Sequence, residues 1–215
     1  SFHAAFLRLR ATTAPDNTEP TPEPTDIAQR RQRLIAELDE AAKLTTTDPD
    51  VLLELGQLYQ DMGDQQKADA QFDLAEKAAP DNLNVYLARA QAILRIEDFT
   101  AAAALADRML AAPVGEQRVD LLAPAAEFYA LTGRIEDAAK CIDELRRAGV
   151  PPEVPAYLEG VIAMARNDTP KALESFEEVV RRNPQYARAQ LLLGRCHVRN
   201  GHPRQAVTPL KEYVR

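Results

Sequence analysis

Histidine and cysteine side chains can act as nucleophiles or bind a metal ion, and this 215-residue chain contains three histidines and two cysteines. They are His3, His197, His202, Cys141 and Cys196. The three histidines are not spaced so that they would share one helix face with carboxylates. Cys196 and His197 are neighbours, but adjacent residues of a helix point about 100° apart, so the pair is not a preformed catalytic dyad. The sequence therefore predicts no metal site and no cofactor.

Other catalytic arrangements are also missing from the sequence. Its two serines, Ser1 and Ser175, do not lie in a nucleophile motif. No glycine-rich loop of the kind that cradles a phosphate occurs in the chain. We therefore predict that the chain is not an enzyme.

Composition restricts the class of protein further. The chain is 46% hydrophobic and 27% charged, with a formal net charge of −7. It is too apolar for a disordered protein, and it contains no apolar run near the roughly 18 residues of a membrane-spanning helix. Its acidity argues against nucleic acid as the main partner. Two cysteines cannot build a disulfide scaffold, and the compartment, cytoplasmic or periplasmic, stays open.

The first 25 residues differ from the rest of the chain. Residues 1–10 form a short amphipathic segment in which Phe2, Phe6 and Leu9 follow a helical spacing. Residues 11–25 contain four prolines and five threonines, which predicts an extended, semi-stiff linker. Three interpretations of residues 1–10 stay open. They are a solvated terminus, the end of a removed membrane anchor, and an apolar tail that docks in a groove of the same or a neighbouring molecule.

An internal repeat follows the linker. Alanines recur at intervals of 34, 36, 34 and 34 residues, at Ala68, Ala102, Ala138, Ala172 and Ala206. A second series, at intervals of 34, comprises Gly133, Asn167 and Gly201, and Gly63 lies 70 residues before Gly133. Self-similarity at a fixed period of this length indicates stacked structural units, here five of them.

The unit over residues 49–82 carries the fullest pattern, with Leu52, Leu55, Gly56, Tyr59, Ala68, Phe72, Ala75 and Pro80. It resembles the tetratricopeptide repeat family, whose unit reads W-x2-L-G-x2-Y, then A-x3-F, then P, with Leu52 in place of the tryptophan. The resemblance covers residues 49–215. It implies an all-α fold, a right-handed α-solenoid of about five helix–turn–helix units. Their bounds are 49–82, 83–118, 119–152, 153–186 and an incomplete 187–215.

Packing explains this pattern without reference to the family. Each unit reads as two antiparallel helices, A and B, with a small residue such as Gly160 where the axes approach and a large one such as Phe176 in the adjacent hole. In the third unit we expect Pro124 to mark a late start of helix A, because the missing N–H is harmless only in a first turn. We expect Thr169 to cap a helix.

Both ends of the array carry signals. Residues 26–48 are predicted to form an N-terminal capping helix, because Leu34, Leu38 and Ala41 precede Ala68, Phe72 and Ala75 by 34 residues. At the other end the chain stops at Arg215, inside the B helix of the fifth unit and without a polar capping helix. Because an uncapped end exposes apolar surface, we expect the chain to be a fragment of a longer protein.

The family resemblance also implies a partner-binding groove. In this family the A helices line the concave face, at unit positions 2, 5, 9, 12 and 13. The residues expected to bind a partner there are Leu53, Gln57, Gln91, Arg95, Glu127, Val154, Tyr157, Val161, Met164, Arg188, Leu191, Arg195 and Arg199. Leu131 and Ala165 occupy position 13 of the third and fourth units. The lining is polar in the first unit, apolar in the fourth and basic in the fifth.

The groove predicts a class of partner. Family members that grip the carboxylate end of a chaperone tail use Lys and Asn at positions 5 and 9 of the first repeat, where this chain has Leu53 and Gln57. That clamp is therefore absent. The apolar fourth unit next to Arg188, Arg195 and Arg199 suits an extended or helical peptide with apolar anchors and an acidic end.

Other interpretations of these residues stay open. The three arginines would equally form a solvated face paired with acidic residues, and Tyr157 and Met164 would be ordinary packing residues. The acidic first unit and the basic fifth unit would also allow head-to-tail stacking in a homo-oligomer. Phe2, Phe6 and Leu9 are a further candidate occupant of the groove.

We predict a non-catalytic protein–protein interaction scaffold or adaptor of bacterial type that binds a peptide or subunit and supports assembly of a complex. One alternative is a membrane-tethered assembly or secretion factor of a bacterial envelope system, in which membrane contact comes only through an anchor outside this chain. The other is the docking module of a larger enzyme.

Overall fold

The structure is a computed structural model that describes residues 33–37, 39–40, 43 and 47–214. Within these residues the secondary structure is α-helical, with one short 3-10 helix and no β-strand. The predicted tail residues Phe2, Phe6 and Leu9 and the predicted linker over 11–25 lie outside the described residues. The part of the chain that is described contains no helix both long enough and apolar enough to span a bilayer.

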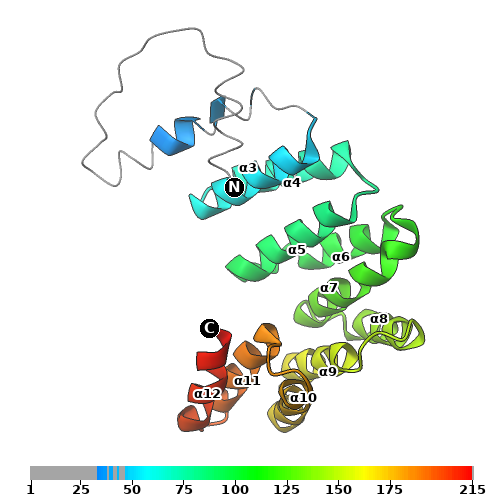
Figure 1. The fold of residues 1–215 in the computed structure, drawn as a ribbon, viewed down its shortest axis with the longest axis vertical. Coiled ribbons are helices and arrows are strands. Elements are labelled where there is room, and N and C mark those ends of the chain that lie inside the picture. Colours follow the sequence, from blue (N-terminus) through cyan, green and yellow to red (C-terminus); the bar gives the residue numbers. More distant parts are fainter. Residues whose placement is uncertain (1–32, 38, 41–42, 44–46, 215) are drawn as a thin grey trace. The chain divides into compact units, whose positions relative to one another are not determined.

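The chain divides into two compact units, Ser1–Ala92 and Ile93–Arg215. In the first, helix α3 (Pro49–Asp61) packs along helix α4 (Gln65–Ala78), and helix α5 (Leu83–Ile96) follows (Figure 1). Its core includes Leu52, Leu55, Tyr59, Ala68, Phe72, Ala75, Val85 and Ala92. A Cβ atom on Gly56 would lie 2.7 Å from Cε1 of Phe72, so the small residue is needed where the two helices approach.

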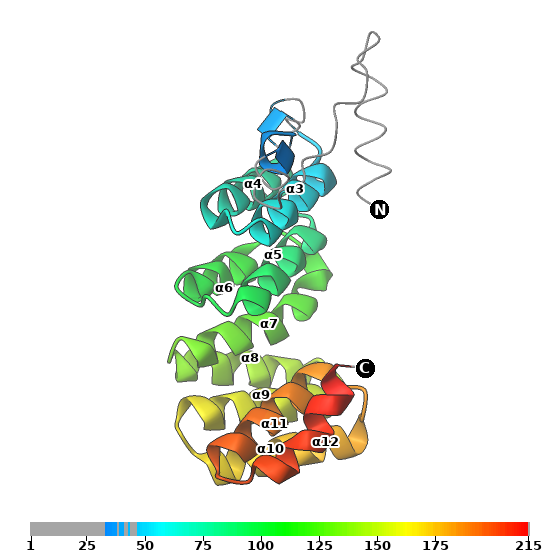
Figure 2. The ribbon, with the colours of Figure 1, turned by 90° about the vertical axis from the view of Figure 1, so that its left-hand side faces the viewer.

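The second unit continues the alternation of helices. They are α6 (Ala102–Ala111), the 3-10 helix η1 (Gly115–Gln117), α7 (Arg118–Leu131), α8 (Ile135–Arg147), α9 (Glu153–Ala165), α10 (Thr169–Arg182), α11 (Ala187–Arg199) and α12 (Pro203–Tyr213). Helices α7 and α8, α9 and α10, and α11 and α12 pack as adjacent pairs (Figure 2). Helix α7 also contacts α9. Helix α7 therefore lies beside the first helix of the next pair.

The turn between the two helices of a pair requires a left-handed residue. This residue is Gly63, Glu97, Gly133, Asn167 and Gly201 in the successive units, with φ values of 76°, 55°, 81°, 59° and 77°. Glycine and asparagine accept this conformation readily, whereas a glutamate does so at a cost of about 1 kcal/mol. Glu97 is therefore the unusual member of the series.

Two local expectations were wrong. Helix α7 begins at Arg118, so Pro124 lies inside the helix instead of at its start. Buried residues on both sides of the proline, Leu122 and Ala125 among them, keep the helix continuous and offset the hydrogen bond that proline removes. The cap of α10 is Asp168, whose side chain accepts a hydrogen bond from the backbone N–H of Lys171 at 3.2 Å, and Thr169 is the first helical residue.

An acidic residue recurs at one position of the B helices. Asp39, Asp73, Asp107, Asp143 and Glu177 follow one another at intervals of 34, 34, 36 and 34 residues. In two units it holds a tyrosine of the next A helix. Tyr59 Oη donates to Asp39 at 2.7 Å, and Tyr129 Oη donates to Asp107 at 2.7 Å.

A basic side chain completes each of these two contacts. Lys67 Nζ lies 2.7 Å from Asp39, and Arg134 Nη1 lies 2.8 Å from Asp107. The same cations stand over the tyrosine rings, at 5.4 Å for Lys67 over Tyr59 and 4.4 Å for Arg134 over Tyr129. Each cluster joins a B helix, the following A helix and the start of that A helix's partner.

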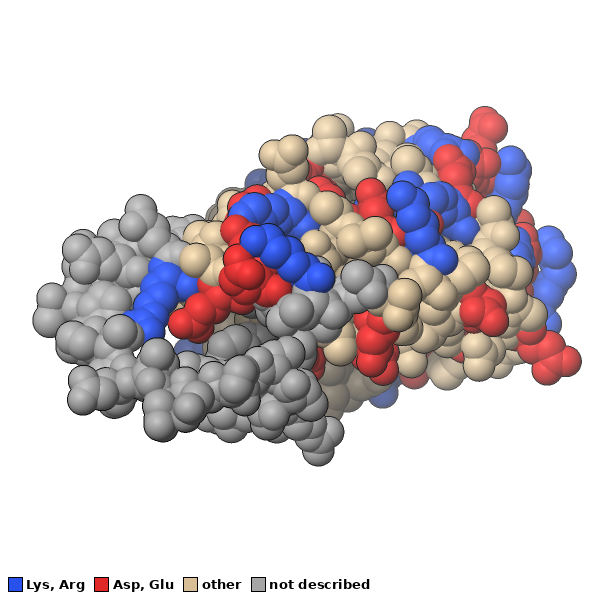
Figure 3. Space-filling view, turned by 90° about the horizontal axis from the view of Figure 1, so that it is seen from above, with Lys and Arg blue, Asp and Glu red and all other residues tan. Residues whose placement is uncertain are grey.

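Charged side chains of both signs are interspersed on the surface. On the face shown in Figure 3, the basic residues mostly stand beside acidic ones. This agrees with the many ion pairs among the described residues, for example Arg118 with Glu144 at 2.6 Å. Exposed pairs of this kind contribute little to stability, about 0–1 kcal/mol each.

Candidate functional site

A pocket of about 180 Å³ in the second unit gathers residues from three successive A helices, α7, α9 and α11, and from the turn after α5. Its lining residues are Glu97, Phe99, Glu127, Leu131, Val161, Met164, Ala165, Arg188, Leu192 and Arg195. Apolar side chains form most of the lining. Four charged residues, Glu97, Glu127, Arg188 and Arg195, stand among them.

Five of the residues predicted for the groove line this pocket: Glu127, Val161, Met164, Arg188 and Arg195. Leu131 and Ala165, at predicted position 13 of their units, line it as well. Glu97, Phe99 and Leu192 were missed by sequence reasoning. A signal existed for Glu97, because it lies 34 residues after Gly63 and so occupies the position of the turn.

The remaining predicted residues do not line this pocket. Arg95, Val154, Tyr157, Leu191 and Arg199 belong to the same compact unit but lie outside the lining. Leu53, Gln57 and Gln91 belong to the first unit, where Leu53 is buried in the core and the two glutamines are exposed. The groove residues of the first unit stay a prediction.

Glu127, Tyr157 and Arg188 form one hydrogen-bonded group, with one residue from each of α7, α9 and α11. Tyr157 Oη donates to Glu127 Oε1 at 2.8 Å. Arg188 donates to the same oxygen from Nη2 at 3.0 Å and from Nε at 3.3 Å. The side chain of Glu127 is 8% exposed and that of Arg188 is 25% exposed, so the ion pair is largely withdrawn from water.

Tyr157 anchors this group in the core. Its ring stacks on Tyr186 with centroids 5.1 Å apart, and it lies 5.9 Å from Phe176. Burial, together with the neighbouring Glu127 carboxylate, raises the pKa of Tyr157 well above its usual value. Burial alone would lower the pKa of Arg188, but Glu127 holds it above its usual value. The tyrosine is therefore neutral and the arginine charged at ordinary pH.

Arg195 and Glu97 form an ion pair at the pocket. Arg195 Nη2 lies 2.5 Å from Glu97 Oε1, and both side chains are more than 40% exposed. Glu97 is the residue held at positive φ where the other units have glycine or asparagine. The lining of this pocket therefore includes a residue with a strained backbone.

The third predicted arginine is also engaged. Arg199 Nη2 donates to the side-chain oxygen of Asn167, another residue at positive φ. Each of the three predicted arginines therefore has a partner within the second unit: Arg188 with Glu127, Arg195 with Glu97 and Arg199 with Asn167. Among the described residues, only Arg188 and Arg195 are paired with acidic residues, and of these two pairs only that of Arg195 is solvent-exposed, so the interpretation as a solvated, acid-paired face stays a prediction.

Of the candidate nucleophiles and metal ligands, Cys141, Cys196 and His197 are buried, whereas His202 is exposed and His3 lies outside the described residues. Cys141 and Cys196 are buried and are not joined in a disulfide. Burial raises the pKa of the Cys141 thiol to about 11 and also raises the pKa of Cys196. His197 is buried, and its Nδ1 atom has no hydrogen-bond partner. Among the described residues, no group of three His, Cys, Asp or Glu side chains is arranged to hold a metal ion.

Comparison with family models assigns the repeats. Residues 49–82 and residues 157–215 each match a model described as a tetratricopeptide repeat. The chain contains tetratricopeptide repeats. The repeats confirm the resemblance drawn from the sequence, and the tetratricopeptide repeat fold supports a protein–protein interaction module.

Solved structures share this fold. A tetratricopeptide repeat protein from Parabacteroides merdae superposes with a TM-score of 0.63 at 15% identity, covering 86% of this chain and 72% of its own. PilW, a type IV pilus biogenesis factor, superposes with a TM-score of 0.52 at 17% identity, covering 77% of this chain and 76% of its own. A search of curated protein sequences found no match. At these identities the two structures show the fold alone.

Proposed function

We propose that this protein is a non-catalytic scaffold that binds a peptide segment of a partner protein in the pocket between α7, α9 and α11. The observation that carries the proposal is the convergence of five sequence-predicted groove residues on one pocket, next to a strained glutamate. A volume of about 180 Å³ is below the roughly 300–1,000 Å³ of pockets for drug-sized ligands. It suits one or two side chains of a peptide.

The pocket suggests which parts of a partner it accepts. Val161, Met164 and Leu192 offer an apolar lining for an aliphatic or aromatic anchor. Arg195 offers a positive charge next to this lining. Its pair with Glu97 is solvent-exposed and therefore weak, so an acidic group of the partner would replace Glu97 as the carboxylate that binds Arg195. Arg188 is committed to the withdrawn pair with Glu127 and keeps a positioning role.

The proposed function includes no reaction. The two thiols have raised pKa values, so they stay protonated at neutral pH and act as small core residues. Affinity would come from anchor burial and charge complementarity, so substitutions in the pocket would act mainly on the dissociation rate.

The test is affinity capture from the native lysate, read by mass spectrometry, with four baits. They are the natural chain, Met164→Glu, Arg195→Glu and a control, Arg204→Glu, which changes an exposed arginine of α12 outside the pocket. We expect a partner that the natural chain and the control retain and that both pocket variants lose. Equal recovery by all four baits would show that recognition occurs elsewhere.

A second measurement tests the role of Glu97. With the captured partner, Glu97→Gln should raise the affinity, because the internal competitor for Arg195 is removed. Unchanged affinity would mean that Arg195 does not contact an acidic group of the partner.

The two alternatives, a membrane-tethered envelope assembly factor and a docking module of a larger enzyme, stay predictions. The identity of the captured partner separates them: envelope assembly components would favour the first, and a substrate of a linked enzyme the second. Head-to-tail self-association likewise stays a prediction.

A further inference from the structure

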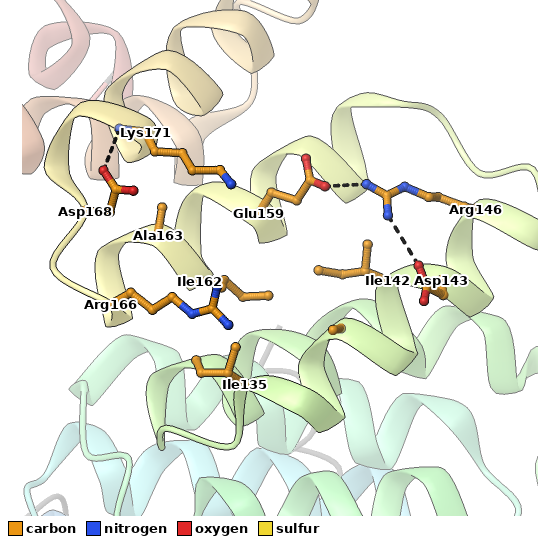
Figure 4. A pocket seen from close by; sticks show the side chains of 11 residues that line it. Ile135, Ile142, Asp143, Arg146, Glu159, Ile162, Ala163, Arg166, Asp168 and Lys171 are labelled. Atoms are coloured by element: carbon orange, nitrogen blue, oxygen red, sulfur yellow. Dashed lines mark hydrogen bonds and ion pairs between the residues drawn. The ribbon is translucent and has the colours of Figure 1, made fainter.

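A second pocket, of about 220 Å³, lies between α8, α9 and the start of α10 (Figure 4). Ile135, Ile142 and Ile162 give it an apolar lining, and Ile142 is almost completely buried. Three basic residues, Arg146, Arg166 and Lys171, stand around these isoleucines. It is therefore a small apolar recess bordered by charge.

Helix α9 separates this pocket from the pocket of the proposed function. Val161, Met164 and Ala165 line the first pocket, whereas Ile162 and Arg166 line the second. At about 100° per residue, Val161, Met164 and Ala165 point to one side of α9, and Ile162 and Arg166 are rotated away from them about the helix axis. A ligand of one pocket leaves the other accessible.

Three carboxylates, those of Asp143, Glu159 and Asp168, line the second pocket together with the three cations, but in the described part of the chain ion pairs are recorded for only one of the cations. Arg146 binds both Asp143 and Glu159, so these three residues satisfy one another. The carboxylate of Asp168 accepts the backbone N–H of Lys171 and so serves as the cap of α10. For the guanidinium of Arg166 and the ammonium of Lys171, the structure records no ion-pair partner among the described residues. Figure 4 shows the Arg166 side chain extending to Ile162 and the Lys171 side chain extending toward Glu159.

Two unpaired cations beside an apolar recess favour a ligand that is anionic at one end and apolar at the other. The volume again lies below that of pockets for drug-sized ligands, so the recess fits one side chain together with a neighbouring carboxylate. A peptide supplies both groups on adjacent residues. A bare inorganic anion would leave the three isoleucines uncovered.

We propose that the recess formed by Ile135, Ile142, Ile162, Arg166 and Lys171 is a second binding site, for an acidic peptide segment in which an aliphatic side chain neighbours a carboxylate. The aliphatic side chain packs on the three isoleucines. The carboxylate accepts hydrogen bonds from Arg166 and Lys171. With both pockets in use, the protein holds two partner segments on different faces of α9.

The test uses the full chain with isotope-labelled isoleucine methyl groups, observed by NMR. The probes are the dipeptide N-acetyl-leucyl-glutamyl amide, its neutral analogue N-acetyl-leucyl-glutaminyl amide, and inorganic phosphate. We expect the acidic dipeptide to shift the methyl signals of Ile135, Ile142 and Ile162, with affinity at least about tenfold greater than that of the neutral analogue. Equal shifts by both dipeptides, or no shift by either, would overturn the proposal.

Matched variants identify the cations. Arg166→Gln with Lys171→Gln should abolish the preference for the acidic dipeptide. Arg204→Gln with Lys211→Gln, which neutralises two exposed cations of α12, should leave it unchanged. If inorganic phosphate shifts the same signals and displaces the acidic dipeptide at equal concentration, the site is a simple anion site and the peptide proposal is wrong. Unchanged binding by Met164→Glu would show that this site is independent of the first pocket.

Discussion

Arg188 in α11 and Glu127 in α7 are joined by two hydrogen bonds to a single carboxylate oxygen, although 61 residues separate them in the sequence. Between these two helices, α9 contributes Tyr157 to the same oxygen. The three A helices of the second unit are therefore connected by polar contacts as well as by apolar packing. Glu127 and Arg188 also line the pocket of the proposed function, whereas Tyr157 does not.

Replacing Arg188 should destabilise the protein strongly. Arg188→Met leaves the carboxylate of Glu127 withdrawn from water without its cation, and the loss of one partner of a buried pair costs about 3–5 kcal/mol. Urea denaturation of the full chain measures the change in the free energy of unfolding. The double variant Glu127→Gln with Arg188→Met should recover part of the loss, because no unpaired charge remains. A double variant less stable than Arg188→Met alone would contradict this account.

The hydroxyl of Tyr157 should contribute more than that of its stacked neighbour. Tyr157→Phe removes a hydrogen bond to a charged acceptor and should lower the free energy of unfolding by about 1–3 kcal/mol. Tyr186→Phe keeps the stacked ring and removes a hydroxyl for which the structure records no hydrogen bond among the described residues, so its effect should stay below about 0.5 kcal/mol. Similar losses in the two variants would show that the bond to Glu127 contributes little.

A methyl group at Gly160 should be poorly tolerated. Its Cβ would lie 2.6 Å from Cε1 of Phe176, which is fully buried, so Gly160→Ala should cost about 1–3 kcal/mol. Phe176→Leu alone is also destabilising. In the double variant Gly160→Ala with Phe176→Leu, however, leucine has no ring beside the new methyl group, so part of the loss caused by Gly160→Ala should be recovered. Thermal unfolding of the four proteins gives the coupling. Strictly additive effects would show that the two side chains do not compete for the same space.

Glu97 should be a residue whose replacement improves stability. Glu97→Gly removes the strain of a positive φ, worth about 1 kcal/mol, and loses an exposed ion pair worth about 0–1 kcal/mol. The variant should therefore be as stable as the natural chain or more stable by up to about 1 kcal/mol. Glu97→Ala keeps the strain and loses the pair, so it should be the less stable of the two. The reverse order, measured by urea denaturation, would contradict the assignment of strain.

Acid should weaken the contact between Asp107 and Tyr129. Arg134, and after it Tyr129, hold the pKa of Asp107 below its usual value of 3.8. Because the pKa is lower in the folded state, the stabilisation is complete above the unfolded value and is lost as the pH falls through the folded value. The free energy of unfolding should therefore decrease as the pH is lowered below about 4. Asp107→Asn should reduce this slope, and Asp39 should account for part of the remainder.

Much of the fold could be predicted from the sequence because its determinants recur at a fixed period. Gly160 and Phe176 occupy the same repeat positions as Gly56 and Phe72. The packing of the helices in one repeat therefore predicts their packing in the other. The prediction for Pro124 failed because a local rule for proline ignores the buried residues on both sides of it, which hold the helix together.

The site was predicted less completely, since its interactions join residues far apart in the chain. The spacing of groove positions placed Val161 and Met164 in the lining. It could not reveal that Arg195 would meet Glu97, 98 residues away. The spacing of 34 residues from Gly63 identifies Glu97 as a turn residue, but glutamate is not the glycine or asparagine that usually occupies this turn.

The recurring acidic residue of the B helices makes the repeats individually distinct. Asp39 and Asp107 each receive a tyrosine hydroxyl, whereas Asp73 pairs with Arg89 of the next helix at 2.5 Å. The same backbone position therefore requires a different neighbour at different junctions. A chimera with two of its repeats exchanged would retain every consensus residue and yet bring mismatched side chains together, so the order of the repeats is itself encoded in the chain.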